Sequence, residues 1–295
     1  MKISIITSSK LPQGAKEDQP LFTALQQQNI DFDICIWDKP TEWQKYTVCL
    51  MRTVWDYHEK IHDFNQWLNL VSTRTKVLNR ADIIKWNQNK LYLKELADFG
   101  ITIAPTVWLN KSKLIDYDKV FNALTSEWAF LKPVIGADSA GTLRFKNDPK
   151  GIAMAQKHLS NWLNRYDMML QPYLKTVETF GETSVIYING QFTHGIRKIP
   201  QSGDYRVQDT FGASDVVYEP NAAELSLSKA CLQYITHKFE LPLYARFDFL
   251  HDERGAVYLN EAELLEPSLF FHHCPIAATN MAQALATYCS YSVIT

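Results

Sequence analysis

Two short segments in the last fifth of the chain carry charged residues at alternate positions. They are Arg246-x-Asp248 and Glu261-x-Glu263. Alternate residues of a β-strand share one face, so antiparallel pairing of the two segments would gather three carboxylates and one guanidinium. Three carboxylates repel one another unless a cation lies among them. Such oxygen ligands favour Mg²⁺ or Mn²⁺, with nucleotide phosphates completing the shell. The alternative is a salt-bridged sheet face exposed to water.

A loop of small residues follows Lys132, between two strand-like runs. Its glycines, Gly136 and Gly141, have the spacing of a P-loop, but Thr142 stands where a P-loop needs lysine. Small residues such as Ser139 let backbone N–H groups approach phosphate oxygens, and Lys132 would supply charge to the same phosphates. An ordinary polar hairpin loop with an exposed lysine is the competing interpretation.

A third segment, 171–174, ends an apolar strand-like run. The backbone of Gln171, Tyr173 and Leu174 can bond the edge of a planar base, and Glu178 can accept hydrogen bonds from ribose hydroxyls. Taken alone, Glu178 fits a plain surface glutamate better than a ribose contact.

A fourth segment is polar and cationic. Lys198 precedes the glycine-flanked loop 203–213, which contains Arg206. A mobile loop with cations suits a negatively charged reacting group. The alternative is a disordered surface loop.

Two other groups of residues could belong to a functional site. Arg52 ends a predicted strand, where its guanidinium suits a substrate carboxylate, although an Arg52–Asp56 ion pair explains it equally well. His272, His273 and Cys274 suggest a metal or nucleophile site. We reject that site because adjacent histidines on a helix point about 100° apart and no base accompanies the cysteine.

The elements that position these residues fall into three groups. Residues 1–80 alternate strands with helices, which predicts a small parallel α/β domain. Residues 81–173 read as an α+β layer, and residues 174–295 as a hairpin turning at Asn189-Gly190, a helix begun by Asn221, two strands and a last helix. The expected strands are 3–7, 33–37, 47–51, 102–109, 129–133, 142–145, 168–174, 183–189, 191–198, 244–250 and 256–261. The expected helices are 19–28, 61–70, 91–99, 150–163, 222–239 and 276–288.

Composition narrows the class of protein. The chain has 295 residues, a net charge of −2 and only 11 glycines, none of them two apart, so a dinucleotide-binding GxGxxG is absent. The balanced charge argues against nucleic-acid or membrane partners. The five cysteines form no CxxC pair, which predicts buried free thiols in a reducing compartment, and no signal-peptide core follows Met1. We therefore expect a cytoplasmic protein.

In order and spacing, these segments resemble the ATP-grasp ligases. The family pattern has Asn89-Lys90 opening a helix, then Lys132, then Gln171 with an acidic residue seven positions later. It continues with Arg-x-Asp on a strand, an acidic residue thirteen positions after that aspartate, and a second ligand two further on. The resemblance spans about Asn79 to Phe271 and implies the ATP-grasp fold, in which two α+β subdomains grip ATP, preceded by the small N-terminal domain.

Within this family, the chain is most similar to the cyclo-ligase branch of cycloserine biosynthesis, which acts on O-ureido-D-serine. The shared segments are residues 52–57 and 260–268. The chain is also related to glutathione synthetases and ribosomal-protein glutamate ligases. It departs from these at Glu263, where asparagine is frequent, at Gln208, where their pattern has asparagine, and at Gly212-Ala213, where it has Gly-Gly.

The resemblance implies an ATP-dependent reaction in which a substrate carboxylate becomes an acyl phosphate and a nitrogen, of another molecule or the same one, displaces phosphate to give an amide. It implies nucleotide contacts by Lys90, Lys132, Gly136, Ser139, Gly141, Gln171, Tyr173, Leu174 and Glu178. It implies two Mg²⁺ ions, or Mn²⁺, on Asp248, Glu261 and Glu263. It further implies catalytic contacts by Arg246, Arg206 and Lys198, and substrate contacts by Arg52 and Ser268.

Two other activities fit the same residues. A kinase on this fold would transfer phosphate to a stable acceptor, and a nucleotide-binding module would catalyse nothing. The module is disfavoured because both lysines and all three acidic ligands are present. For oligomeric state, the expectation is a homodimer, on frequency alone.

Overall fold

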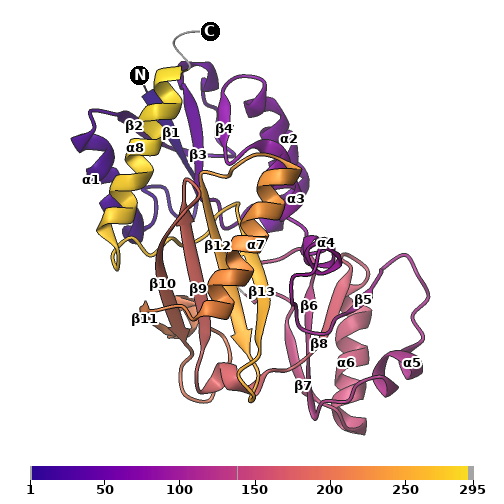
Figure 1. Ribbon diagram of the computed structural model, residues 1–295. Coiled ribbons are helices and arrows are strands. Elements are labelled where there is room, and N and C mark those ends of the chain that lie inside the picture. The colour runs from indigo at the N-terminus through magenta and orange to yellow at the C-terminus, as the bar shows by residue number, and fades with distance from the viewer. Residues whose placement is uncertain (1, 138, 292–295) are drawn as a thin grey trace.

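The computed structural model describes residues 2–137 and 139–291, folded around three separate β-sheets (Figure 1). The first sheet is parallel, with four strands in the order β2-β1-β3-β4. Its elements are β1 (Lys2–Thr7), α1 (Gln19–Gln27), β2 (Asp31–Ile36), β3 (Val48–Thr53), α2 (Ile61–Ser72) and β4 (Lys76–Leu78). The predicted parallel α/β unit is present. Sequence analysis missed β4, because three residues are too few to show alternation.

The second sheet is antiparallel and four-stranded, in the order β5-β8-β6-β7. Its elements are β5 (Val107–Leu109), α5 (Tyr117–Asn122), β6 (Trp128–Pro133), β7 (Leu143–Lys146), α6 (Pro149–Trp162) and β8 (Met168–Pro172). The expected strand 102–109 is shorter than predicted, and α5 was not predicted. Leu131, Phe145, Leu159 and Leu170 belong to the apolar cluster that joins this sheet to its helices.

The third sheet is antiparallel and five-stranded, in the order β11-β10-β9-β12-β13. Its elements are β9 (Glu182–Ile188), β10 (Gln191–Ile199), β11 (Ser214–Tyr218), α7 (Ala222–Lys238), β12 (Tyr244–His251) and β13 (Val257–Glu263). The Asn189-Gly190 turn has positive φ at both residues, as a tight hairpin requires. The capping box of Asn221 and Glu224 is also present. Edge strand β11 was not predicted.

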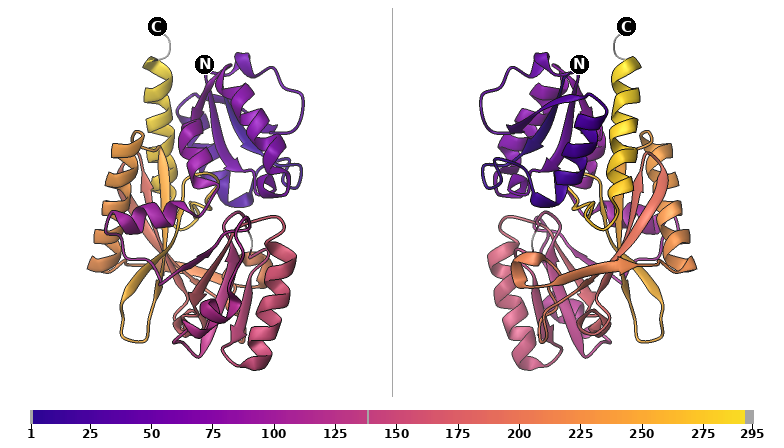
Figure 2. Two further views of the ribbon diagram at one scale, coloured as in Figure 1. Left: turned by 90° about the vertical axis from the view of Figure 1, so that its right-hand side faces the viewer. Right: turned by 90° about the vertical axis from the view of Figure 1, so that its left-hand side faces the viewer.

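Three helices connect the layers. They are α3 (Ala81–Asn87), α4 (Tyr92–Asp98) and α8 (Pro275–Tyr291). Short 3₁₀ helices cover Lys16–Asp18, Trp43–Lys45, Tyr57–Lys60, Lys175–Glu178 and Asp209–Phe211. Figure 2 shows α8 returning from the third sheet to stand beside the first. There it packs on α1, so that Leu21 and Leu25 share a core with Met281 and Leu285.

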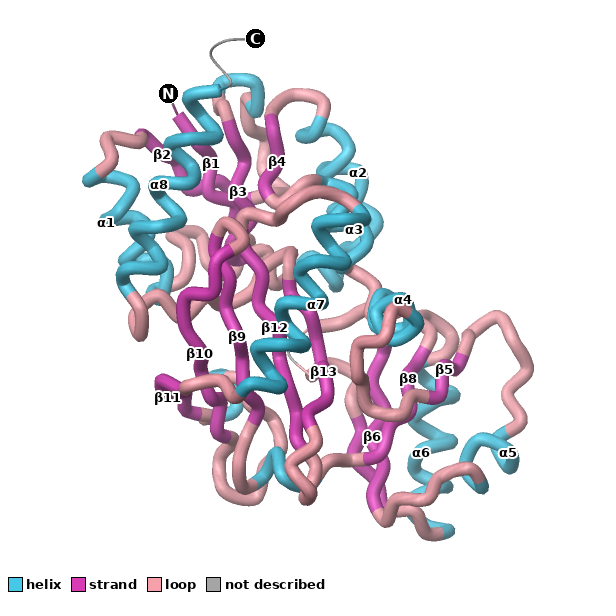
Figure 3. The backbone as a smooth tube through the Cα atoms, in the orientation of Figure 1, coloured by secondary structure: helices cyan, strands magenta, loops and turns pink. Residues whose placement is uncertain are grey.

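The arrangement leaves the second and third sheets facing each other, while α7 covers the outer side of the third (Figure 3). Within the described residues, no helix is both long and apolar enough to cross a membrane. Cys35, Cys49 and Cys231 are buried free thiols and Cys274 is a half-buried one, while the side chain of Cys289 lies outside the described part.

Candidate active site

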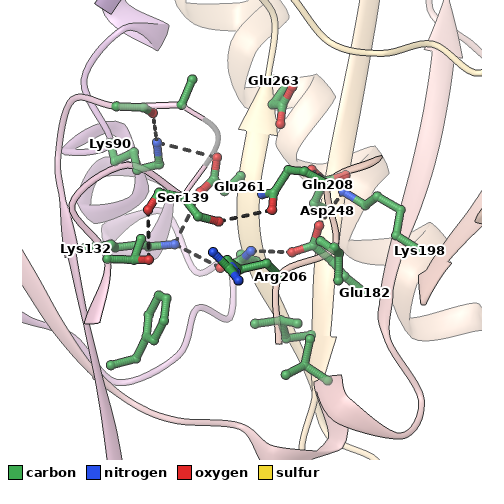
Figure 4. Close-up of a pocket in the computed structure, with 18 of the residues that line it drawn as sticks. Lys90, Lys132, Ser139, Glu182, Lys198, Arg206, Gln208, Asp248, Glu261 and Glu263 are labelled. Atoms are coloured by element: carbon green, nitrogen blue, oxygen red, sulfur yellow. Dashed lines mark hydrogen bonds and ion pairs between the residues drawn. The ribbon is translucent and has the colours of Figure 1, made fainter. Parts of the chain in front are cut away.

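A cavity of about 330 Å³ opens between the second and third sheets. Figure 4 shows charged side chains entering it from both sides. Most of the residues expected from sequence line it, namely Lys90, Lys132, Gly136, Ser139, Gln171, Tyr173, Leu174, Lys198, Arg206, Arg246, Asp248, Glu261, Glu263 and Ser268. Gly141, Glu178 and Arg52 are not among the lining residues.

The carboxylates come from the paired strands β12 and β13. The strands are antiparallel, with Arg246 opposite Glu263 and Asp248 opposite Glu261, so all four side chains share one face. Asp248 accepts hydrogen bonds from Arg246 Nε at 2.9 Å and from Ser184 Oγ at 2.6 Å. Arg246 also pairs closely with Glu263. The convergence predicted from alternation is therefore present.

The cations around the three carboxylates do not compensate them equally. Burial, together with repulsion from Asp248 and Glu261, outweighs the attraction of Arg246 and raises the pKa of Glu263 to about 7. At Asp248, burial would raise the pKa, but Arg246 and Lys198 outweigh it and hold the pKa well below its usual range. A carboxylate that resists ionisation beside two ionised ones fits a site for divalent cations, which remove that repulsion.

Two lysines reach this carboxylate group from the opposite side of the cavity. Lys132, at the end of β6, places Nζ 2.9 Å from Asn260 Oδ1 and 3.4 Å from Glu261 Oε1. Lys90 Nζ lies 2.9 Å from the Gly136 carbonyl and 3.6 Å from Glu261 Oε2. Burial of Glu261 is offset by Lys90 and Lys132, which lower its pKa. Both lysines therefore have Glu261 as their acidic partner, and phosphate oxygens could bind them in its place.

A further acidic residue, Glu182, was missed by sequence analysis. It begins β9, pairs closely with Lys198 and accepts a hydrogen bond from Asn260 Nδ2 at 2.6 Å. Lys198 Nζ also lies 3.3 Å from Asp248. Burial raises the pKa of Glu182. The available signal was alternation, since Glu182 stands two before Ser184, which also faces the cavity side.

The two candidate loops touch each other across the cavity. Ser139 Oγ donates to Gln208 Oε1 at 3.1 Å, and the hydroxyls of Thr142 and Tyr205 lie 3.3 Å apart. Gly141 has a φ of +73°, and a Cβ there would lie 2.6 Å from the Trp162 ring, so its role is to let the loop turn. The loop that carries Ser139 is therefore in direct contact with the loop 203–213 beside the cavity.

Arg206 lines the cavity but is engaged within its own loop. Its guanidinium pairs with Asp204 at 2.7 Å and lies 3.8 Å from the centre of the Phe211 ring. The adjacent guanidinium lowers the pKa of Asp204 to about 2. Asp204 engages Nε and Nη2 of Arg206, so the guanidinium is oriented by its own loop.

The expected base-binding segment, 171–174, begins in the last two residues of β8. Gln171 donates to Thr106 Oγ1 at 2.8 Å, and the Tyr173 amide donates to the Trp128 carbonyl at 2.9 Å. Glu178 accepts a hydrogen bond from the Tyr173 hydroxyl at 2.6 Å and pairs closely with Arg144. Arg144 was missed because this pairing joins positions 34 residues apart.

The other end of the cavity meets the N-terminal sheet. Ser268 lines it and donates a hydrogen bond to Glu17, whose pKa burial and the neighbouring Asp18 raise to about 7. Arg52 is fully buried, and its Nε and Nη2 lie 3.1 and 2.8 Å from one oxygen of Asp18. The expected alternative, an Arg52–Asp56 pair, is wrong because Asp56 instead accepts a hydrogen bond from Trp37 Nε1 at 2.9 Å.

The reason for rejecting the histidine pair is also wrong. His272 and His273 lie in a turn before α8, not on a helix, and the Nε2 atoms of both face Asp215 on β11. Two adjacent histidines can converge in a turn because its backbone does not impose the helical rotation. Cys274 is not part of this group.

Two segments of the chain match known protein families. Residues 3–79 match the family described as the N-terminal domain of D-cycloserine synthetase DcsG. Residues 89–238 match the ATP-grasp domain of prokaryotic glutathione synthetase. In sequence, the chain is 28% identical to the cycloserine biosynthesis protein DcsG of Streptomyces lavendulae, over 90% of this chain and 92% of that protein.

Solved structures show the same fold. The crystal structure of D-cycloserine synthetase DcsG superposes with a TM-score of 0.87 at 22% identity, covering 98% of this chain and all of that one. The D-alanine–D-alanine ligase of Bacillus anthracis superposes with a TM-score of 0.65 at 15% identity, covering 99% of this chain and 97% of that one. The cavity between two α+β layers and both sets of matches lead to one conclusion: the chain belongs to the ATP-grasp family.

Proposed function

We propose that this protein is an ATP- and Mg²⁺-dependent ligase that activates a substrate carboxylate as an acyl phosphate and forms an amide C–N bond. The observation that carries the proposal is the meeting of Lys90 and Lys132 with Glu261, beside Asp248 and Glu263, in one cavity. Cations from one layer and carboxylates from the other would together enclose a polyphosphate and its metal ions.

In this proposal the ATP contacts are divided between the layers. Lys90 and Lys132 hold the α- and β-phosphates, while Asp248, Glu261 and Glu263 hold two Mg²⁺ ions. When bound, these ions neutralise phosphate charge and fix the geometry of transfer. The base lies against Gln171, Tyr173 and Leu174. Glu178 is available to the ribose once it exchanges its bond to Arg144.

The remaining cations act on the reacting groups. Arg246 and Lys198 are already held by Asp248, so their positions are set before substrate binds. Arg206, oriented by its own loop, joins them. The loop 136–142 and the loop 203–213 exclude water from the acyl phosphate, which would otherwise hydrolyse.

For the substrate, we propose an amino-acid derivative that closes a ring on itself. The support is the similarity over 90% of the chain to a protein named for cycloserine biosynthesis. The carboxylate oxygen attacks the γ-phosphorus and ADP leaves; a nitrogen of the same molecule then attacks the acyl carbon, loses a proton and expels phosphate. Ser268 lines the end of the cavity that is suited to the substrate, and Glu17, outside the lining, accepts its hydrogen bond and has a raised pKa.

The test is a screen of amino acids and their derivatives, O-ureidoserine included, for release of ADP and phosphate with Mg²⁺. Hydroxylamine is added to trap the acyl phosphate as a hydroxamate. We expect hydroxamate to form with the true substrate and a cyclic amide to form without hydroxylamine. A stable phosphoester with no hydroxamate would replace the ligase by a kinase. ATP binding without turnover on any carboxylate would leave only a binding module.

A further inference from the structure

Three side chains that the proposed reaction does not use converge at the edge of the third sheet. Asp215 stands on edge strand β11 (Figure 1), and His272 and His273 lie in the turn before α8. His272 Nε2 lies 3.2 Å from Asp215 Oδ1, His273 Nε2 contacts the same oxygen closely, and the ring centres are 4.1 Å apart. One ligand atom from each residue falls within 4.8 Å of the others.

Among the described residues, no lysine or arginine compensates the negative charge of Asp215. Its side chain is only 15% exposed. Lys198 is its cross-strand neighbour but directs Nζ to Glu182 and Asp248 instead. A largely buried carboxylate that faces two imidazoles provides ligand atoms for a bound cation.

We infer that Asp215, His272 and His273 bind a divalent transition-metal ion of the Zn²⁺ class. Two imidazole nitrogens and one carboxylate oxygen are ligands that Zn²⁺ and Co²⁺ accept, whereas Mg²⁺ prefers oxygen alone. Three protein ligands leave a fourth position for water, and the side chain of His272 is 46% exposed, so solvent has access. This site is separate from the carboxylates Asp248, Glu261 and Glu263.

The bound ion would join two walls of the cavity. β11 continues directly from the loop 203–213, and His272 follows Phe270, whose ring lies 5.7 Å from the Arg246 guanidinium. Phe270 has a φ of +49°, which a bulky residue adopts only when its surroundings hold it there. The ion would hold the turn that follows this strained residue and so support the cavity wall formed by Ser268 and Phe270.

The test is a titration of the full-length, chelator-treated protein with Co²⁺ in excess Mg²⁺, followed by visible absorption and equilibrium dialysis. Mg²⁺ competes for oxygen ligands but not for imidazole, so the carboxylate site is masked. We expect one equivalent of Co²⁺ with nitrogen ligation. The double variant H272A/H273A should weaken this binding by at least about tenfold, and Asp215→Asn should act in the same direction.

The matched control is His62→Ala, on the surface of α2, where the imidazole bonds to Gln66. It should bind Co²⁺ as the wild type does. Thermal melting of each variant in chelator shows that it is folded, and added Zn²⁺ should raise the melting temperature of the wild type but not of H272A/H273A. Either of two outcomes would contradict the metal site: no saturable Co²⁺ binding by the wild type, or unchanged binding by H272A/H273A. The three side chains would then form only a hydrogen-bonded cluster.

Discussion

Arg52 and Arg246 are both buried arginines paired with carboxylates, yet their surroundings differ. Arg52 pairs with Asp18 at the end of the first sheet, where both side chains are fully buried and outside the cavity lining. Arg246 pairs with Asp248 and Glu263, and Glu261 stands in the same row facing the cavity. A buried ion pair outside the cavity has a structural role, whereas a group of carboxylates and cations that lines the cavity is arranged to bind a ligand.

The largest expected effect comes from removing a carboxylate from the group that lines the cavity. Glu261→Gln keeps the shape but takes away the charge that faces both lysines, so turnover with Mg²⁺ and ATP should fall by about 10³-fold. Steady-state ADP release measures the loss, and an unchanged melting temperature shows that the fold persists. Full Mg²⁺-dependent turnover in this variant would remove Glu261 from the site.

The next effect concerns the buried ion pair of Arg52 and Asp18. Arg52→Leu leaves Asp18 buried without a partner and should lower the free energy of unfolding by about 3–5 kcal/mol, as measured in urea. The double variant R52L/D18L should recover much of this loss, because an apolar pair of similar volume avoids the buried charge.

The double variant also separates two roles for Arg52. If the pair is structural, R52L/D18L keeps its Michaelis constant for the carboxylate substrate. A large rise in that constant, in a protein of normal stability, would instead make Arg52 the substrate-binding residue expected from sequence.

A third effect depends on pH. The pKa of Glu263 is raised to about 7, above its ordinary value of 4.5, so the folded protein holds more protons than the unfolded chain in that interval. Its contribution to stability is full below about pH 4.5 and is lost as pH rises towards 7. Thermal melting between pH 5 and 8 should show this decline, which Glu263→Gln should flatten. Mg²⁺ should flatten it too, by binding the ionised carboxylate. Equal slopes in all three samples would contradict the raised pKa of Glu263.

The smallest effect tests the contact between loops. Tyr205→Phe removes the hydroxyl that lies 3.3 Å from Thr142, a bond worth on the order of 1 kcal/mol. The Michaelis constant for ATP should rise by about fivefold, with a larger share of uncoupled ATP hydrolysis as water enters. Tyr258→Phe, a partly buried tyrosine outside the cavity lining, serves as the control.

The features that depend on local residue spacing could be predicted from the sequence. The alternation of Arg246, Asp248, Glu261 and Glu263 fixed one shared face, and the strands do pair as expected. Glu17 and Arg144 could not be found in this way, because their importance comes from partners far along the chain. The same limit explains Arg52, whose partner lies 34 residues upstream, and Asp215, whose histidines lie 57 and 58 residues downstream.

The return of α8 to the first sheet has a consequence for synthesis on the ribosome. The core around Leu21 and Leu25 includes Met281 and Leu285, which are synthesised long after α1. Until α8 emerges from the ribosome, the part of α1 that it covers stays exposed, although the strands beside α1 are already complete. A chaperone can bind this surface during synthesis, and a stop codon just before α8 would leave it exposed.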